Sequence, residues 1–346
     1  MGRTSAITCS HLPAGLWVLV IAGIILTGCT ATRPTVKIGL VAPFEGAQRA
    51  LGYEVLYAVK LALQERNDQG GVGGFGIELV ALSDDGQPAN AVRQAQALAV
   101  DPGVVGVLGP WQTATAQAAA PAFAQAGLPV VAPAALPDET LRLSPGVYRL
   151  YAGDDALAQT LASSVSGEAV WTFDGSVPGW PAALERTVSS AETGATVIVL
   201  TGDGESIART LVGGRCHDRT VACLAGPAAQ EPVVAARAGD AFTELVWVSS
   251  LPAVDCRTGL ADFCRSYTAL AGRTPGPYAV LAYDATNALL DAVAQVARTG
   301  RPQRPAVSAA LTDVQWPGLS GTIAFDATRS WMKAPTFLRR LELDPP

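Results

Sequence analysis

Histidine is almost absent from this sequence, which contains only His11 and His217. Hydrolytic sites built on a serine or cysteine nucleophile, and metal sites of the zinc type, usually need an imidazole in a cleft. The sequence also lacks a GxSxG elbow, a phosphate-binding GxxxxGK[ST] loop and an HExxH helix. These absences predict a protein that is not an enzyme and that holds no metal and no cofactor.

Runs of lysine and arginine are also missing. The 346 residues carry 24 Lys+Arg against 30 Asp+Glu, which gives a formal net charge of −6. A mildly acidic chain without basic runs is a poor partner for nucleic acid or for an anionic membrane surface. The hydrophobic share of 49% argues against disorder, and the length exceeds what one core usually supports, so we expect two domains.

The N-terminal apolar segment is too short to cross a membrane. It runs from Leu16 to Leu26, which as a helix rises about 16 Å against roughly 30 Å of hydrocarbon. It follows Arg3 and ends in LTGC at positions 26–29, which resembles a bacterial lipobox. We therefore expect a signal peptide over 1–28, a lipidated Cys29, a tether over 29–35 and a location on the extracytoplasmic face of the membrane. An uncleaved signal anchor is the alternative.

Four cysteines remain after this segment, in two near pairs: Cys216, Cys223, Cys256 and Cys264. An even set on an exported chain predicts disulfides, most simply Cys216–Cys223 and Cys256–Cys264. The alternative is a metal site that combines the first pair with His217 and Asp218, although it lacks the paired spacing of a zinc module.

Short runs of Val, Ile and Leu alternate with helical patterns along the rest of the chain. Continuous apolar strands of this kind are typical of parallel sheets covered by helices on both faces. The strand patterns come in two sets, at 36–42, 77–83, 104–109 and 129–133, and then at 168–174, 195–201, 221–225 and 243–250. A helix over 278–298 and a last strand over 321–325 follow. The pattern predicts two doubly wound α/β units.

Several fragments in a fixed order carry a family resemblance. They are VKIGLVAPFEG at 36–46, NDQGGV at 67–72, DD at 84–85, PYA at 277–279 and GLSGTIAFDA at 318–327. Together they resemble the type I periplasmic binding proteins of ABC importers, in particular the branched-chain amino-acid group. The resemblance implies two Rossmann-like lobes joined by a three-strand hinge, with lobe 1 over 36–136 and 277–317 and lobe 2 over 137–276 and 318–346.

The resemblance also implies a function. A monomeric, lipid-anchored solute-binding protein would capture an amino acid or a related amide or carboxylate by lobe closure and deliver it to ABC permease subunits. A lipoprotein of the same fold that senses ligand or regulates an envelope partner is the alternative. Ligands of open α/β sheets bind outside the carboxyl ends of the strands.

The loop after 104–109 is the first expected contact, through Trp111, Gln112 and Thr113. It enters a helix, so free backbone N–H groups and the positive end of the helix dipole suit a carboxylate. The resemblance implies that the Thr113 hydroxyl contacts that carboxylate. The alternative is that Thr113 is simply the N-cap of the helix.

The loop after 129–133 departs from the family, which has a threonine where this chain has Leu136. We expect the N–H of Leu136 and the carbonyl of Ala134 to remain available for ligand.

In the second lobe, Ala228 stands where the resemblance implies an acid for the ligand ammonium. Gln230 or Glu231 can substitute if the loop is longer. Trp180 is the expected aromatic contact, and Asp203 is a further acid that can face a cation.

Overall fold

The computed structural model describes residues 33–174, 179–214, 216, 220–243 and 245–340. The predicted signal peptide and Cys29 lie outside these residues. Within the part of the chain that is described, no helix is both long enough and apolar enough to span a membrane.

The first lobe is built on a five-stranded parallel sheet with the order β2-β1-β3-β4-β5. Its inner strands are buried almost throughout, as their unbroken Val and Leu content predicts. The strands are β1 (Thr35–Ala42), β2 (Gly76–Ser83), β3 (Val104–Leu108), β4 (Val130–Ala132) and β5 (Val147–Arg149).

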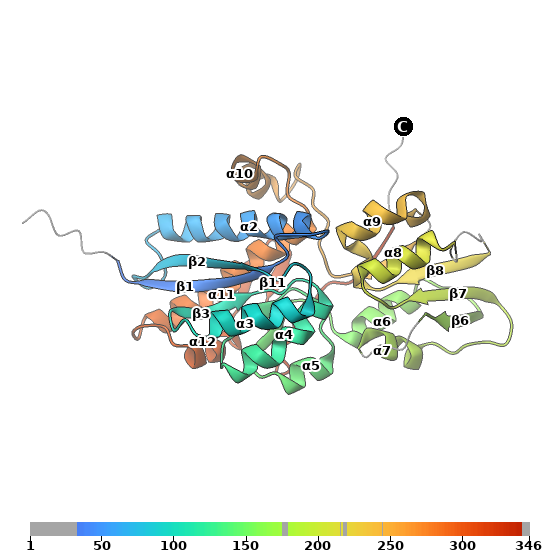
Figure 1. Ribbon diagram of the computed structural model, residues 1–346, viewed down its shortest axis with the longest axis horizontal. Helices are drawn as coiled ribbons and strands as arrows, with labels where there is room; N and C mark the ends of the chain where they lie inside the picture. Colours follow the sequence, from blue (N-terminus) through green and yellow to red (C-terminus); the bar gives the residue numbers. More distant parts are fainter. Residues whose placement is uncertain (1–32, 175–178, 215, 217–219, 244, 341–346) are drawn as a thin grey trace, which may run out of the picture. The chain divides into compact units, whose positions relative to one another are not determined.

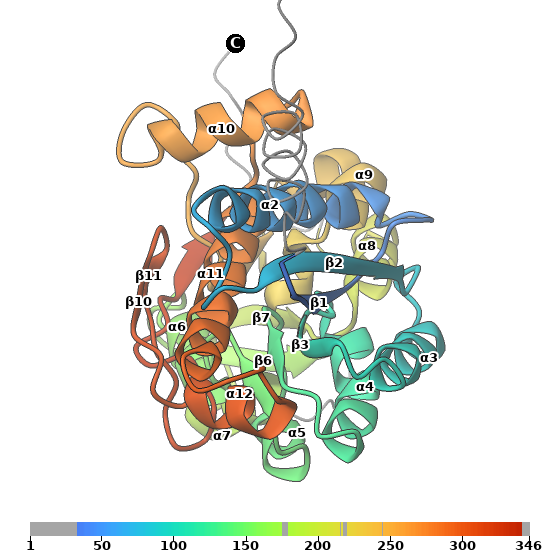
Figure 2. The same cartoon turned by 90° about the vertical axis from the view of Figure 1, so that its left-hand side faces the viewer.

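Helices cover both faces of this sheet. One face carries α2 and α11, which pack on each other, and the opposite face carries α3 and α4 (Figure 2). The helices of this lobe are α2 (Arg49–Asp68), α3 (Pro88–Ala99), α4 (Thr113–Gln125), α5 (Asp138–Leu143), α10 (Ala261–Ala271), α11 (Pro277–Ala297) and α12 (Arg304–Leu311).

The second lobe repeats this plan on a sheet with the order β12-β9-β8-β7-β6. Its first four strands along the chain are parallel, and β12 joins antiparallel to β9. Helices α6 and α7 lie on one face and α8 and α9 on the other (Figure 1). The strands are β6 (Ala169–Phe173), β7 (Ala195–Leu200), β8 (Val221–Ala225), β9 (Val246–Ser249) and β12 (Phe337–Arg339). The helices are α6 (Asp154–Ala162), α7 (Trp180–Thr187), α8 (Gly204–Val212), α9 (Pro232–Ala238) and the short 3₁₀ helices η1 (Pro227–Gln230) and η2 (Gly239–Phe242).

The chain passes between the lobes three times, from β5 to α6, from β9 to α10 and from β11 to β12. These crossings differ from the expected lobe boundaries. The strand β5 pairs with β4 in the first sheet, so the first crossing comes after Arg149 and not at 136. The hairpin of β10 (Trp316–Gly318) and β11 (Gly321–Ile323) packs on α11, and α10 packs on α2. We therefore place 138–149, 261–276 and 318–323 with lobe 1, because sheet pairing and helix packing hold them there.

Hydrogen bonds tie the crossings to one another. The guanidinium of Arg149 donates to the Leu136 carbonyl (2.5 Å) and to the Ser330 hydroxyl (2.6 Å). The Tyr151 hydroxyl accepts from the backbone N–H of Ser250 (3.0 Å), on the second crossing. All three crossings thus share polar contacts that have no access to water, which favours movement of the lobes as rigid bodies about this hinge.

Two disulfides brace local excursions of the chain. Cys216 bonds to Cys223 in the middle of β8, and Cys256, in the segment between β9 and α10, bonds to Cys264 in α10. His217 and Asp218, the other members of the alternative metal site, lie outside the described residues. Both thiols that such a site would need are used in the first disulfide.

Asp284 anchors the β10–β11 hairpin to α11. Its carboxylate accepts the backbone N–H groups of Leu319 (2.8 Å) and Ser320 (2.7 Å) and the Ser320 hydroxyl. A Cβ at Gly318 would lie 2.6 Å from the carboxyl carbon, so the hairpin approaches this side chain as closely as a glycine permits. Asp284 lies on the helix that begins with the PYA fragment at 277–279, and its role here is structural.

We expect Asp284→Asn to destabilise the protein by about 1–3 kcal/mol. The new amide N–H group would face a backbone N–H group of Leu319 or Ser320, so that two donors meet in a buried site. Chemical denaturation measures this change. The matched control is Asp291→Asn on the same helix, where the half-buried carboxylate accepts only a glutamine amide among the described contacts. Equal effects of the two variants would contradict the anchoring role.

Candidate functional site

A cleft of about 530 Å³ lies where the carboxyl ends of the strands of both sheets meet. Loops that follow β1, β2, β3 and β4 line it from the first lobe, and loops that follow β6, β7 and β8 line it from the second. The lining residues that carry polar or aromatic side chains are Gln48, Asp85, Gln87, Gln112, Thr113, Thr115, Gln117, Trp180, Thr201, Asp203, Glu205 and Glu231. This is the place that parallel sheets favour for a ligand.

Glu231 joins the two walls of the cleft. Its Oε2 accepts a hydrogen bond from Nε2 of Gln48 (2.8 Å) and another from Nε2 of Gln112 (2.9 Å), both in lobe 1. The residue is only 6% exposed. The pKa of its carboxyl is raised to about 7, chiefly by burial. The Gln112 hydrogen bond lowers this pKa, and the neighbouring carboxylates of Asp203 and Glu205 raise it.

The preceding residue, Gln230, faces the hinge. Its side chain donates to the Tyr151 hydroxyl (3.0 Å) and accepts from the Ser249 hydroxyl. The sequence left open whether Gln230 or Glu231 stands in for the acid that Ala228 replaces. The structure directs Gln230 to the hinge and Glu231 to the cleft, because the 3₁₀ helix η1 turns consecutive side chains in different directions.

Trp180 forms an apolar wall of the cleft at the start of α7. The indole is 9% exposed and lies against the backbone of Gly226, where a Cβ would come within 2.1 Å of its Cζ2. Any larger residue at position 226 would push the ring out of this position. The wall therefore depends on the glycine that follows β8.

Helix α4 begins at Thr113, and Gln112 is its N-cap without a side-chain cap hydrogen bond. The first backbone N–H that reaches back to the N-cap carbonyl belongs to Ala116. Thr113 thus lines the cleft as the first helical residue and is not the N-cap. Trp111 is 2% exposed and borders a small cavity below the cleft, so its role is closer to packing than to direct contact.

Two of the groups that were expected to contact the ligand form hydrogen bonds within the protein. The N–H of Leu136 donates to the Ala134 carbonyl (2.8 Å), so the pair expected to remain available for ligand satisfies itself in a tight turn. The carboxylate of Asp203 accepts the N–H of Ser206 (2.8 Å) as the N-cap of α8, although the residue also lines the cleft.

Gln48 is a site residue that sequence reasoning missed. It lies two residues past the last letter of the VKIGLVAPFEG fragment and is 7% exposed. Its Oε1 and that of Gln112 are buried without a hydrogen-bond partner, as is Nε1 of Trp111. A glutamine in a loop gives no periodic signal, so only the fold could bring it to Glu231.

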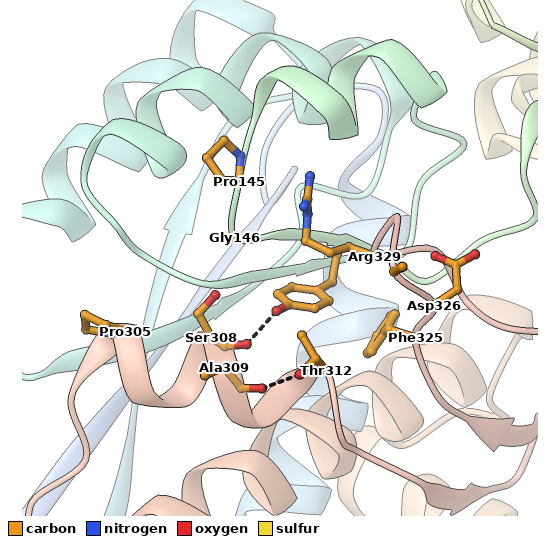
Figure 3. Close-up of a pocket in the computed structure, with 11 residues that line it drawn as sticks. Pro145, Gly146, Pro305, Ser308, Ala309, Thr312, Phe325, Asp326 and Arg329 are labelled. Atoms are coloured by element: carbon orange, nitrogen blue, oxygen red, sulfur yellow. Dashed lines mark hydrogen bonds between the residues drawn. The ribbon is translucent and has the colours of Figure 1, made fainter.

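A second hollow, of about 510 Å³, lies between α12, β5 and the segment after β11 (Figure 3). Its polar groups are already paired. The Tyr148 hydroxyl donates to the Ser308 carbonyl (2.5 Å), and the Arg329 guanidinium donates to the carbonyls of Val147 (3.2 Å) and Leu141. The cleft, with its unpaired buried atoms, is the stronger candidate for a ligand site.

A family model described as periplasmic binding protein matches residues 35–191 and 190–344. The chain belongs to the periplasmic binding protein family. No curated protein sequence matches it. Several solved structures share the fold of this periplasmic binding protein at 17–18% identity.

The isoleucine complex of the branched-chain amino acid transporter substrate binding protein LivJ from Streptococcus pneumoniae is 18% identical. Its TM-score is 0.74, with 89% of this chain and 96% of that one covered. Periplasmic binding protein type 1 from Bordetella pertussis is also 18% identical, with a TM-score of 0.72 over 88% and 96% of the two chains. A benzoate-bound solute binding protein from R. palustris is 17% identical, with a TM-score of 0.69 over 89% and 93%. The expected type I architecture is thereby confirmed.

The raised pKa of Glu231 makes the stability of the folded protein depend on pH. An acid whose pKa is raised from 4.5 to about 7 on folding stabilises the protein below about pH 4.5 and loses that contribution as the pH rises through about 7. We expect Glu231→Gln to become more stable relative to the wild type as the pH rises from about 5 to 8, by at most about 3 kcal/mol. Thermal melts of both proteins at each pH measure the difference.

Asp84, whose pKa burial raises to about 6, contributes in the same direction but is present in both proteins, so it cancels from the comparison. Parallel melting curves of wild type and variant across this pH range would contradict the prediction.

Proposed function

We propose that this periplasmic binding protein captures a small polar ligand between its lobes and delivers it to an ABC permease, without chemical conversion. The observation that carries the proposal is the cleft itself, lined from both lobes and bridged by Glu231. Ligand binding that favours the closed arrangement presents the permease with a different surface, which is how closure signals occupancy.

The ligand class follows from the groups in the cleft. The start of α4 offers backbone N–H groups and a hydroxyl to a carboxylate, and Trp180 offers an apolar face. An amino acid, or a related amide or carboxylate, has the matching groups. Isoleucine and benzoate, named in the solved complexes of similar fold, are ligands of this size.

The experiment is a thermal-shift screen of the purified chain with amino acids, small amides and aromatic acids. A stabilising ligand, followed by calorimetry and by scattering that reports lobe closure, supports the proposal. A ligand that binds without closure would favour sensing over delivery, and the absence of binding across the whole screen would contradict a solute-binding role.

We expect Thr113→Ala to weaken binding of a carboxylate-bearing ligand found in the screen by about tenfold to a hundredfold, since it removes one hydrogen bond to a charged group. Calorimetry measures the affinity. The matched control is Thr312→Ala at the end of α12, away from the cleft, which should leave affinity unchanged. Equal affinities of wild type and Thr113→Ala would place the carboxylate elsewhere.

Trp180→Ala should weaken every ligand, charged or not, because it removes the apolar wall of the cleft. Trp111→Ala should act chiefly on the free energy of unfolding, since this side chain is buried below the cleft. Calorimetry and denaturation together separate the two effects, and an unchanged affinity in Trp180→Ala would show that the ligand does not contact this wall.

We propose that the chain is anchored as a lipoprotein through Cys29. The LTGC motif after a short apolar core supports this, and intact-mass analysis of the membrane fraction should find residues 1–28 removed and acyl mass added. A Cys29→Ser protein that is still acylated and cleaved at the same bond would refute the anchor.

A further inference from the structure

The described residues that line the cleft include four acids and no lysine, arginine or histidine. The acids are Asp85, Asp203, Glu205 and Glu231. In that part of the chain, only Glu205 among the four forms an ion pair, with the exposed Arg237 (2.5 Å). The other three have uncharged hydrogen-bond partners, so no basic residue in the described part of the chain forms an ion pair with them.

Two buried oxygen atoms in the same cleft lack a donor. The Nε2 atoms of Gln48 and Gln112 both point at the Glu231 carboxylate, which fixes the orientation of each amide. Their Oε1 atoms therefore face away from Glu231 and have no hydrogen-bond partner among the described residues, and Gln48 is more than nine-tenths buried. Buried acceptors of this kind are normally satisfied, and here the cleft leaves them to whatever enters it.

We propose that the ligand of this cleft is a small organic cation, whose protonated nitrogen donates to the amide oxygens of Gln48 and Gln112 beside the Glu231 carboxylate. An ammonium has three donors and a guanidinium has five, so one such group can satisfy both oxygens at once. A ligand with a net negative charge would meet four carboxylates and no basic partner among the described lining residues.

A ligand of this cationic class can carry a carboxylate only if it also carries an additional positively charged group. The start of α4 can hold the carboxylate, while the acids opposite hold the positive charge. The inference rests on the proposed function, because it assigns a ligand class to the same cleft.

Four probes of similar length separate the charges: L-lysine, cadaverine, L-norleucine and hexanoate. Cadaverine is lysine without the carboxylate, and norleucine is lysine without the terminal ammonium. Calorimetry on the purified chain should find lysine and cadaverine bound at least about tenfold more tightly than norleucine and hexanoate. Norleucine or hexanoate binding as tightly as lysine would overturn the cation inference and leave the solute-binding proposal standing. Failure of all four probes at millimolar concentration would overturn the inference, and the wider screen would then decide the proposed function.

Variants test the groups involved. Gln48→Met removes the whole amide at nearly constant volume, both the unpaired oxygen and the donor to Glu231. It should lower lysine affinity by about tenfold while leaving norleucine affinity unchanged. Gln125→Met, at the exposed last residue of α4 and outside the lining of the cleft, is the matched control and should change neither. An unchanged lysine-to-norleucine ratio in Gln48→Met would overturn the assignment, and thermal melts confirm that each variant is folded.

The pH dependence gives an independent readout. Lysine binding by the wild type should strengthen from about pH 6 to 8, because the Glu231 carboxyl, with its raised pKa, ionises over this range. Asp203 and Glu205 face it from the start of α8, Gln112 and Gln48 from lobe 1, and Arg237 reaches Glu205 from α9. Glu231→Gln should bind lysine more weakly and lose this dependence, and persistence of the wild-type profile in the variant would contradict a role for Glu231.

Discussion

The hydrogen bonds that Glu231 accepts from Gln48 and Gln112 are the interaction that joins the two walls of the cleft. They are charge-assisted when the carboxylate is ionised, and they replace bonds to water that both sides would form in an open protein. The net contribution of these bonds to holding the two walls together is therefore small. A small contribution suits the proposed closure on a ligand, since a ligand then needs only a modest difference in affinity between two states to shift the population.

The hinge holds together the three segments that connect the lobes. Arg149 and Tyr151 tie the three crossings together through buried hydrogen bonds, and Gln230 extends the network from the hinge to the loop that carries Glu231. Gln230, the last residue of the 3₁₀ helix η1, contacts the hinge. The next residue, Glu231, contacts the opposite wall of the cleft. The contacts to the hinge and to the cleft therefore come from two adjacent residues.

The fold could be predicted because its strongest signal is local: unbroken apolar strands separated by helical patterns can form only a parallel sheet covered on both faces. The lobe boundaries could not, because β5 has three residues and its place in the first sheet is decided by pairing with β4. The structure also brings only some of the expected ligand contacts to the cleft. Thr113, Trp180 and Glu231 line the cleft, whereas Leu136 and Ala134 bond to each other, a detail of turn geometry that residue types do not encode.

Gln48 illustrates why ligand chemistry is less predictable than architecture. Proteins that share this fold at 17–18% identity are solved with ligands as different as isoleucine and benzoate, so the sheets carry no information about the ligand. That information lies in loops after the strands, where one side chain two residues beyond a recognisable fragment can supply an acceptor. Three of the four acids that line this cleft have no basic ion-pair partner among the described residues, and two buried amide oxygens beside them have no donor there. A ligand that brings both positive charge and hydrogen-bond donors would satisfy both, which is the physical basis of the proposed specificity.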